Sequence, residues 1–368
     1  MRVVHVASGR LFGGIEQMLV TIAREQTLTP AMVATFAVAA PGRLQETLAA
    51  SAADVRPLGD VRLSRPASIV RARRLFRDVL RSSSADAAIC HAPWSYAIFA
   101  PVARRAGVKT VWWQHDRADG RSLVERWAAR TPADLVIANS VWTSGTAAAI
   151  QPVAPIAVIH PPVTVPAPDG SRVTHRRALR AGEDDVVILS ASRLEPWKGH
   201  RNLIRALAQI RSSRQWRVWI AGAAQRPHEH DYLAELRTMV ASLGVDARVQ
   251  FLGERRDVPA LMQAADVYCQ PNDGPEPFGV VFAEALLSGL PVVTADMGGA
   301  PEIVSAECGT LVPAGDAQAL TAALEALIDD AALRARLGAA GPRHAAARCA
   351  PAAVLPKLEK ALAELGTP

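Results

Sequence analysis

Two cations in the second half of the chain have the types and spacing to bind a diphosphate. Arg193 follows an apolar run, and Lys198 lies five residues later, before a helical pattern that begins near His200. Arginine can bind two phosphate oxygens at once, whereas lysine acts as a point charge. The alternative is two solvated surface cations, the commoner fate of these residues.

Two carboxylates further along the chain could hold hydroxyl groups. Glu276 lies in a predicted loop, and the apolar pattern from Phe278 onward predicts a buried helix that contains Glu284. If the whole segment were helical, the two carboxylates would lie about 12 Å apart. The backbone N–H groups of Phe278, Gly279 and Val280 could bind hydroxyls or phosphate between them. Burying a carboxylate without a partner is costly, which favours function over a partly exposed Glu284 and a helix-terminal Glu276.

The first half carries a glycine-rich turn and a histidine at strand ends. Gly13 and Gly14 would let the backbone approach a ligand, although a tight turn without a ligand is an equal alternative. The spacing is not GxGxxG, which disfavours a dehydrogenase. His115 could donate to a phosphate or polarise a hydroxyl, and the alternative is a capping or core histidine.

The elements that position these residues are short apolar runs alternating with helical patterns. Runs of four to six residues without alternating polarity are typical of parallel strands covered on both faces. The predicted fold class is therefore α/β, with doubly wound sheets whose strand-to-helix junctions carry the chemistry. The predicted strands are residues 3–7, 33–38, 87–91, 110–113, 135–138, 186–191, 217–221, 249–253, 267–270 and 291–295.

A proline-rich stretch at 160–171 divides this pattern into two halves. We expect a first domain over 1–162, joined by a C-terminal helix at 351–368, and a second domain over 163–350. Two α/β domains joined in this way suggest a ligand-binding cleft between them.

Charge is unevenly shared along the 368 residues. Residues 1–165 hold 19 Lys and Arg against 11 Asp and Glu, a net charge of +8, and the remainder has −2. Segment 68–81 carries five arginines around an apolar side and could lie on anionic lipid, although an ordinary helix packed on the sheet is slightly favoured. No recognised motif supports nucleic acid as a partner.

Other features point to a cytoplasmic protein. No apolar run reaches the length of a membrane span, and the start lacks a signal-peptide layout. The four cysteines are scattered, without zinc-ligand spacing, so we expect reduced thiols. Residues 228–231 (His-Glu-His-Asp) are interpreted as a solvated polar loop.

Together the motifs resemble the retaining GT-B glycosyltransferases of family 4. The resemblance rests on the E-x7-E pair Glu276 and Glu284, on Arg193 with Lys198, and on residues 298–304 (Gly-Gly-Ala-Pro-Glu-Ile-Val), in the family's order. It implies two Rossmann-like domains facing a central cleft. It departs from the family at 222–225, where many relatives have a Gly-x-Gly-Pro turn.

The resemblance also implies roles for the residues of the donor domain. Arg193 and Lys198 would neutralise the diphosphate of a UDP- or GDP-linked hexose. Glu276, with the backbone around Phe278 to Val280, would hold the hexose, and Glu284 the ribose. Asp257, after the strand at 249–253, is a candidate contact to the base.

In the first domain, the resemblance places His115 near the sugar and the β-phosphate, with Gly13 and Gly14 lining the cleft. It implies metal-independent transfer with retention to a glycan or lipid-linked acceptor, in cell-surface polysaccharide or glycolipid biosynthesis. No cofactor is expected, and the protein could be peripheral on the inner face of the membrane. A sugar-nucleotide epimerase and a non-catalytic nucleotide-sugar-binding subunit are the alternatives.

Overall fold

The computed structural model describes residues 1–10, 12–167, 169–224 and 226–366, and it divides into two compact units. Unit 1 comprises Met1–Val163 and Cys349–Pro368, and unit 2 comprises Thr164–Arg348. The last two residues of the predicted C-terminal helix lie outside the described residues.

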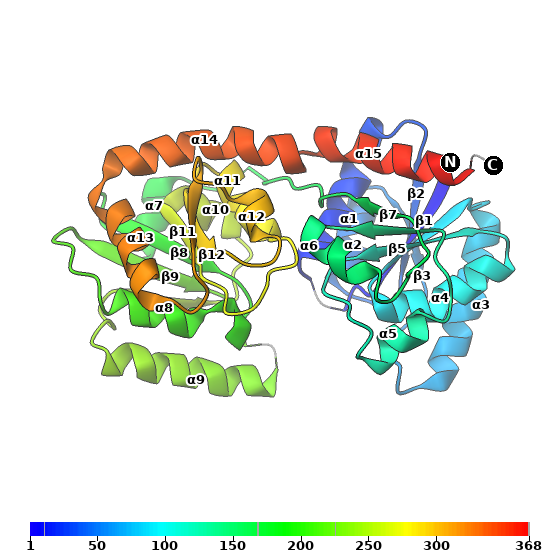
Figure 1. Ribbon diagram of the computed structural model, residues 1–368, viewed down its shortest axis with the longest axis horizontal. Coiled ribbons are helices and arrows are strands. Elements are labelled where there is room, and N and C mark those ends of the chain that lie inside the picture. The colour runs from blue at the N-terminus through cyan, green and yellow to red at the C-terminus, as the bar shows by residue number, and fades with distance from the viewer. Residues whose placement is uncertain (11, 168, 225, 367–368) are drawn as a thin grey trace. The chain divides into compact units, whose positions relative to one another are not determined.

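Unit 1 is built on a seven-stranded parallel sheet in the order β3-β2-β1-β4-β5-β6-β7. Apolar residues on alternate strand positions face opposite sides, and helices cover both, so both faces are buried (Figure 1). The strands are β1 (Arg2–Ala7), β2 (Val33–Val38), β3 (Asp54–Pro57), β4 (Ala87–His91), β5 (Lys109–Gln114), β6 (Leu135–Ala138) and β7 (Ile156–Val158).

Two sets of helices cover this sheet. The core of one face includes residues of α3 (Pro66–Ser82) and α4 (Pro93–Arg105), with α5 (Leu123–Ala128) and α6 (Val141–Ala147) further along the chain. The core of the other face includes residues of α1 (Gly14–Arg24), α2 (Arg43–Ala50) and α15 (Pro351–Ala363). Short 3₁₀ turns lie at Gln26–Leu28 and Glu364–Gly366.

Unit 2 has a six-stranded parallel sheet in the order β10-β9-β8-β11-β12-β13. Helices α8, α9 and α13 pack on one face, and Figure 1 shows α10 and α11 on the other. The strands are β8 (Val186–Ala191), β9 (Trp216–Ala221), β10 (Val249–Gly253), β11 (Val267–Gln270), β12 (Val292–Ala295) and β13 (Gly309–Val312). The helices are α7 (Arg172–Ala178), α8 (His200–Leu207), α9 (Pro227–Ser242), α10 (Val258–Ala264), α11 (Val280–Leu287), α12 (Ala300–Ile303), α13 (Ala317–Asp329) and α14 (Ala331–Cys349), with a 3₁₀ turn at Pro196–Lys198.

The predicted strands all occur, but three observed strands were not predicted. These are β3, β7 and β13, and each lies at an edge of its sheet. Edge strands have only one neighbour, so they can be short and partly polar, and β3 even ends in Pro57. In β3 (Asp-Val-Arg-Pro) and β13 (Gly-Thr-Leu-Val) the apolar run is interrupted, and β7 (Ile-Ala-Val) has only three residues, so none of them shows the four- to six-residue apolar run of the predicted strands.

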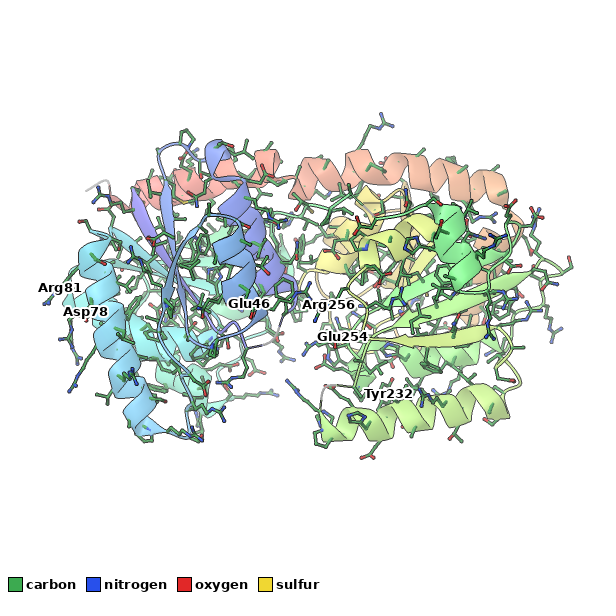
Figure 2. All side chains as sticks on the ribbon, turned by 180° about the vertical axis from the view of Figure 1, so that it is seen from behind. Glu46, Asp78, Arg81, Tyr232, Glu254 and Arg256 are labelled. Atoms are coloured by element: carbon green, nitrogen blue, oxygen red, sulfur yellow. The ribbon has the colours of Figure 1, made fainter. Side chains whose placement is uncertain are left out.

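The arginine-rich segment 68–81 lies within α3 and packs as an ordinary surface helix. Ala72, Phe76, Val79 and Leu80 are buried, whereas Val70 is 50% exposed. Figure 2 shows Arg81 on the outer side of this helix. Within the described residues, no helix combines the length and apolarity needed to cross a membrane.

Candidate functional site

The strand order of unit 2 reverses direction between β8 and β11. Loops that leave such neighbouring strands run to opposite sides of the sheet, so the carboxyl ends open a crevice in which ligands of this fold class bind. Arg193 and Lys198 follow β8, and Glu276 follows β11. The topology thus brings together residues that are about eighty positions apart in the chain.

Glu276 is the centre of a hydrogen-bonded network at this position. Its Oε2 accepts from Lys198 Nζ at 2.8 Å, from Asn272 Nδ2 at 2.8 Å and from Gln270 Nε2 at 3.4 Å. The side chains of Lys198 and Glu276 are only 11% and 12% exposed. Among the described residues none hydrogen-bonds to Glu276 Oε1, so this oxygen can accept from a hydroxyl of a ligand.

Gln270 and Asn272 are site residues that the sequence pattern did not reveal. Gln270 ends β11 and is held by the hydroxyl of Tyr268, which donates to its Oε1 at 3.0 Å. Gln270 Nε2 in turn donates to Asn272 Oδ1 at 2.9 Å. One signal in the sequence could have revealed them. They are polar residues at the end of a buried strand, where they can hydrogen-bond to a polar side chain in the loop that follows.

The two predicted cations have different surroundings. Lys198 Nζ lies 3.9 Å from the centre of the Trp197 ring, a cation–π contact that helps to fix it beside Glu276. Arg193 is 45% exposed and pairs with Glu195 at 3.1 Å, and Glu195 also accepts from Trp197 Nε1 at 3.0 Å. Lys198 is therefore part of the buried network, whereas Arg193 lies at its solvent side.

Backbone packing sets the spacing of these loops. Gly199 has a φ of +77°, and a Cβ there would lie 1.8 Å from the carbonyl oxygen of Pro271. Gly298 has a φ of +68°, and a Cβ there would lie 2.2 Å from the carbonyl oxygen of Glu276, with which it forms an isolated β-bridge. Only glycine fits such contacts, so the loops of Lys198 and Glu276 have defined positions.

The second carboxylate, Glu284, lies in α11, but Glu276 does not. Because Glu276 is in a β-bridge before the helix, the segment is not a continuous helix, and the condition for the 12 Å separation is not met. Gly279 caps α11 with a φ of +95°, Val280 is its first residue, and Phe278 is buried. Burial raises the pKa of Glu284 to about 7 because desolvation disfavours the charged form.

The candidate base contact, Asp257, is paired in this structure. Arg255 donates to its carboxylate through two nitrogens, at 2.8 and 2.5 Å, and this pairing lowers the pKa of Asp257. Asp257 lies at the start of α10. Figure 2 shows Glu254 and Arg256 in the same segment after β10. A base contact through Asp257 would have to share the carboxylate with Arg255.

Unit 1 reverses its strand order between β1 and β4. Gly13 caps α1 after β1, and its N–H donates to Glu16 Oε2 at 3.0 Å, with Gly14 as the first helical residue. His115 follows β5, and its Nε2 lies 2.8 Å from His91 Nδ1. It therefore has a histidine partner that the sequence pattern did not reveal, and its carbonyl accepts from Asn139.

A hollow of about 480 Å³ lies at this reversal point of unit 1. Arg10 and Arg62 both bind Asp60, at 2.6 and 2.8 Å, and Trp94 forms part of the wall. Ser8, Val61, Leu63 and Ser64 also line it. Two arginines share one carboxylate, so the hollow keeps excess positive charge beside an aromatic ring.

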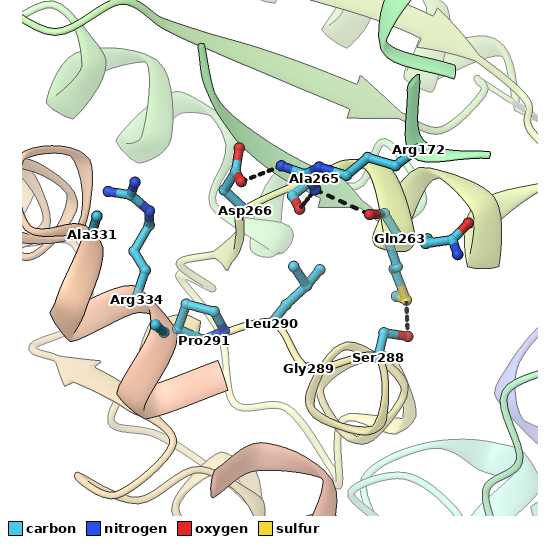
Figure 3. Close-up of a pocket in the computed structure, with 12 residues that line it drawn as sticks. Arg172, Gln263, Ala265, Asp266, Ser288, Gly289, Leu290, Pro291, Ala331 and Arg334 are labelled. Atoms are coloured by element: carbon cyan, nitrogen blue, oxygen red, sulfur yellow. Dashed lines mark hydrogen bonds and ion pairs between the residues drawn. The ribbon is translucent and has the colours of Figure 1, made fainter. Parts of the chain in front are cut away.

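Unit 2 has another hollow, of about 380 Å³, shown in Figure 3. Its residues precede β11 and β12, so it lies at the amino ends of the strands, away from the Glu276 network. Arg172 donates to Asp266 and to two carbonyls, and Arg334 donates to the carbonyls of Leu327 and Ile328. These cations thus have structural partners.

Residues 228–231 form the first turn of α9, so the prediction of a polar loop was wrong. Glu229 is buried and accepts from the backbone N–H of Arg226, which caps the helix. Across the described part of the chain, no three His, Cys, Asp or Glu side chains gather in a way that could hold a metal ion.

Comparison with known proteins identifies the family. The model described as "Glycosyl transferases group 1" matches residues 171–344, and that described as "Glycosyltransferase Family 4" matches residues 12–165. A GDP-mannose-dependent alpha-(1-6)-phosphatidylinositol monomannoside mannosyltransferase of Mycolicibacterium smegmatis is 34% identical over 266 residues, which are 67% of this chain and 68% of the relative. The chain belongs to glycosyltransferase family 4.

Two other relatives add to this assignment. A D-inositol 3-phosphate glycosyltransferase of Jonesia denitrificans is 36% identical over 190 residues, 50% of this glycosyltransferase and only 44% of the relative. The crystal structure of Anabaena HepE in complex with UDP and glucose has a TM-score of 0.84 at 28% identity, covering 99% of this chain and 100% of that one. The glycosyltransferase therefore has the two-domain GT-B fold.

Proposed function

We propose that this protein transfers a hexose from a nucleoside diphosphate sugar to an acceptor that carries an anionic group. The observation that carries the proposal is the Lys198–Glu276 network at the reversal point of unit 2. One carboxylate oxygen is held by three donors, while Lys198 keeps two further N–H groups that can donate to a diphosphate. Glu276 Oε1 would accept from a hydroxyl of the hexose.

The proposed chemistry follows from this charge arrangement. As the sugar–phosphate bond breaks, negative charge grows on the diphosphate, and Lys198 and Arg193 would stabilise it without reorganising. We propose that transfer retains the anomeric configuration and needs no divalent ion. The departing phosphate would take the proton of the acceptor hydroxyl. Transfer in the presence of a chelator, with the anomeric product determined by NMR, tests both points.

The donor is a UDP- or GDP-linked hexose. HepE was crystallised with UDP and glucose, and the mycobacterial relative is named as GDP-mannose-dependent. A thermal-shift series with UDP, GDP and NAD distinguishes the classes, because a ligand that binds the folded state raises the melting temperature. Stabilisation by one diphosphate identifies the base, whereas stabilisation by NAD alone would overturn the proposal.

The hollow of unit 1 supports an anionic acceptor, such as a phosphate-bearing lipid or glycan. Arg10 and Arg62 would bind the phosphate, and the Trp94 ring would contact an attached sugar or cyclitol. The names of the relatives include inositol phosphate and phosphatidylinositol glycosides. Such an acceptor would place the enzyme at the cytoplasmic face of a membrane when its carrier is a lipid.

Arg62→Ala tests the acceptor site against Arg56→Ala as a matched control. Both arginines are about half exposed and each binds a neighbouring aspartate at 2.7–2.8 Å, but only Arg62 lines the hollow. We expect Arg62→Ala to raise the KM for a phosphorylated acceptor about tenfold or more, the loss of one charge-assisted hydrogen bond. Equal effects in the two variants would contradict this assignment.

A further inference from the structure

Three histidines form a hydrogen-bonded row across unit 1. His5 Nδ1 lies 2.9 Å from His91 Nε2, and His91 Nδ1 lies 2.8 Å from His115 Nε2. Their rings are stacked, with centres 5.2 and 5.1 Å apart. The row crosses the adjacent strands β1 and β4 and ends beyond β5.

The row is neutral at physiological pH. Burial lowers the pKa of His5 and of His115 to about 3, and lowers the pKa of His91 well below its usual value. A neutral imidazole has one N–H donor and one acceptor nitrogen. Each histidine of the row therefore contributes a single proton.

Only two proton arrangements satisfy both hydrogen bonds. His91 has one proton, so it donates to one neighbour and must accept from the other. Either all three rings carry the proton on Nδ1, or all three carry it on Nε2. The tautomer of His115 is thus coupled to that of His5, although these two rings do not hydrogen-bond to each other.

The buried end of the row decides between these arrangements. His5 Nε2 is buried and has no hydrogen-bond partner among the described residues. Among buried backbone groups an unpaired N–H is rarer than an unpaired acceptor, and by the same reasoning we infer that Nε2 is the unprotonated nitrogen and that Nδ1 carries the proton. His5 then donates to His91, and His91 donates to His115.

We propose that His91 is a positioning residue that fixes His115 as an Nδ1–H donor directed out of the row. No described residue hydrogen-bonds to His115 Nδ1, and His115 as a whole residue is half-buried. Phosphate oxygens of a nucleotide sugar only accept at neutral pH, so this tautomer suits such a ligand. The ligand part of the proposal rests on the proposed function, whereas the tautomers do not.

Two-bond ¹H–¹⁵N correlation spectra of the full chain with ¹⁵N-labelled histidine, recorded without ligand at pH 7, test the tautomers. We expect Nδ1–H on His5, His91 and His115. A row of Nε2–H tautomers, or averaged signals for His115, would overturn the proposal. This result does not depend on whether any nucleotide binds.

His91→Leu cuts the row, and His5→Leu is the matched control for replacing a buried histidine of the same face. We expect His115 to lose its single tautomer in His91→Leu. In His5→Leu we expect it to keep Nδ1–H, because His91 Nε2 then becomes the buried nitrogen without a partner and stays unprotonated, so His91 still donates to His115. We also expect His91→Leu to weaken UDP or GDP binding about two- to tenfold relative to His5→Leu, the range of one net hydrogen bond. An unchanged His115 signal in a folded His91→Leu variant would refute the coupling, and failure of the wild type to bind either nucleotide would instead refute the proposed function.

Discussion

Lys198→Met isolates the charge at the centre of the donor site. Methionine keeps an apolar stem over the Trp197 ring but removes the ammonium that lies 2.8 Å from Glu276. Two unit charges 4 Å apart interact by about 4 kcal/mol at the effective dielectric of a protein surface and by about 1 kcal/mol in bulk water. Because the side chain of Lys198 is slightly exposed, we expect its interaction energy with a bound diphosphate to lie between these two values. We expect diphosphate affinity to fall by about ten- to a thousandfold.

The same change has a separate effect on stability. Glu276 would keep Asn272 and Gln270 as neutral donors but lose its charged partner, which costs about 1–3 kcal/mol of unfolding free energy. Adding Glu276→Gln removes the uncompensated carboxylate, so the double variant should recover part of that stability. It should not recover diphosphate binding, because the cation is still absent.

Isothermal titration with UDP and with GDP measures the affinity, and urea unfolding measures the stability. Arg201→Met is the matched control, since Arg201 also lies on an aromatic ring, 4.6 Å from that of Tyr232, and pairs with a carboxylate, Glu235, at 2.5 Å. We expect Arg201→Met to bind UDP and GDP with an affinity within about threefold of that of the wild type, because an exposed ion pair contributes less than about 1 kcal/mol. Near-normal binding by Lys198→Met, or an equal loss in Arg201→Met, would refute the reasoning.

Two further predictions concern Glu284 in α11 and Gly199 in the loop of Lys198. The pKa of Glu284 is raised in the folded state from 4.5 to about 7, so its stabilising contribution is full below about pH 4.5 and is lost as the pH rises to about 7. Urea unfolding across this range should therefore show a smaller decline in Glu284→Gln than in the wild type, and identical pH profiles would contradict the raised pKa. Gly199→Ala would place a Cβ 1.8 Å from the Pro271 carbonyl oxygen, so it should lower the melting temperature by several degrees or more and weaken diphosphate binding, whereas Gly244→Ala, at a similar φ but with open space around it, should affect stability alone.

The fold was predictable where burial leaves a clear pattern. Central strands are apolar on both faces, so their sequences alone located them, and the prolines at 160–171 marked the division of the pattern. The edge strand β3 was not predictable, because one neighbour and partial exposure permit its polar residues and its proline, and the edge strand β7 was not predictable because it has only three residues. The first turn of the helix over 227–242 was predicted to be a loop, because the sequence alone does not distinguish a capping glutamate such as Glu229 from a solvated one.

Within the candidate site, the sequence located the residues but not their partners. Lys198 and Glu276 could be selected from residue type and motif, yet their contact depends on the β8–β11 pairing. In the sequence Glu195 is one more charged residue near Arg193, and only the structure shows that the two form an ion pair. The histidine row was hidden for the same reason, because His5 and His91 lie on two strands and His115 follows a third, and the order of these strands is a property of the whole sheet.

The division of unit 1 into two chain segments affects how the protein is made. Val354, Leu355, Leu358 and Leu362 of α15 belong to the core over one face of its sheet. During synthesis β1 to β7 leave the ribosome first, and this face is covered only in part, by α1 and α2, until all of unit 2 has followed. Unit 2 can therefore complete its core earlier than the unit that precedes it. A nascent chain halted before α15 should expose an apolar sheet face, which makes it a client for chaperones.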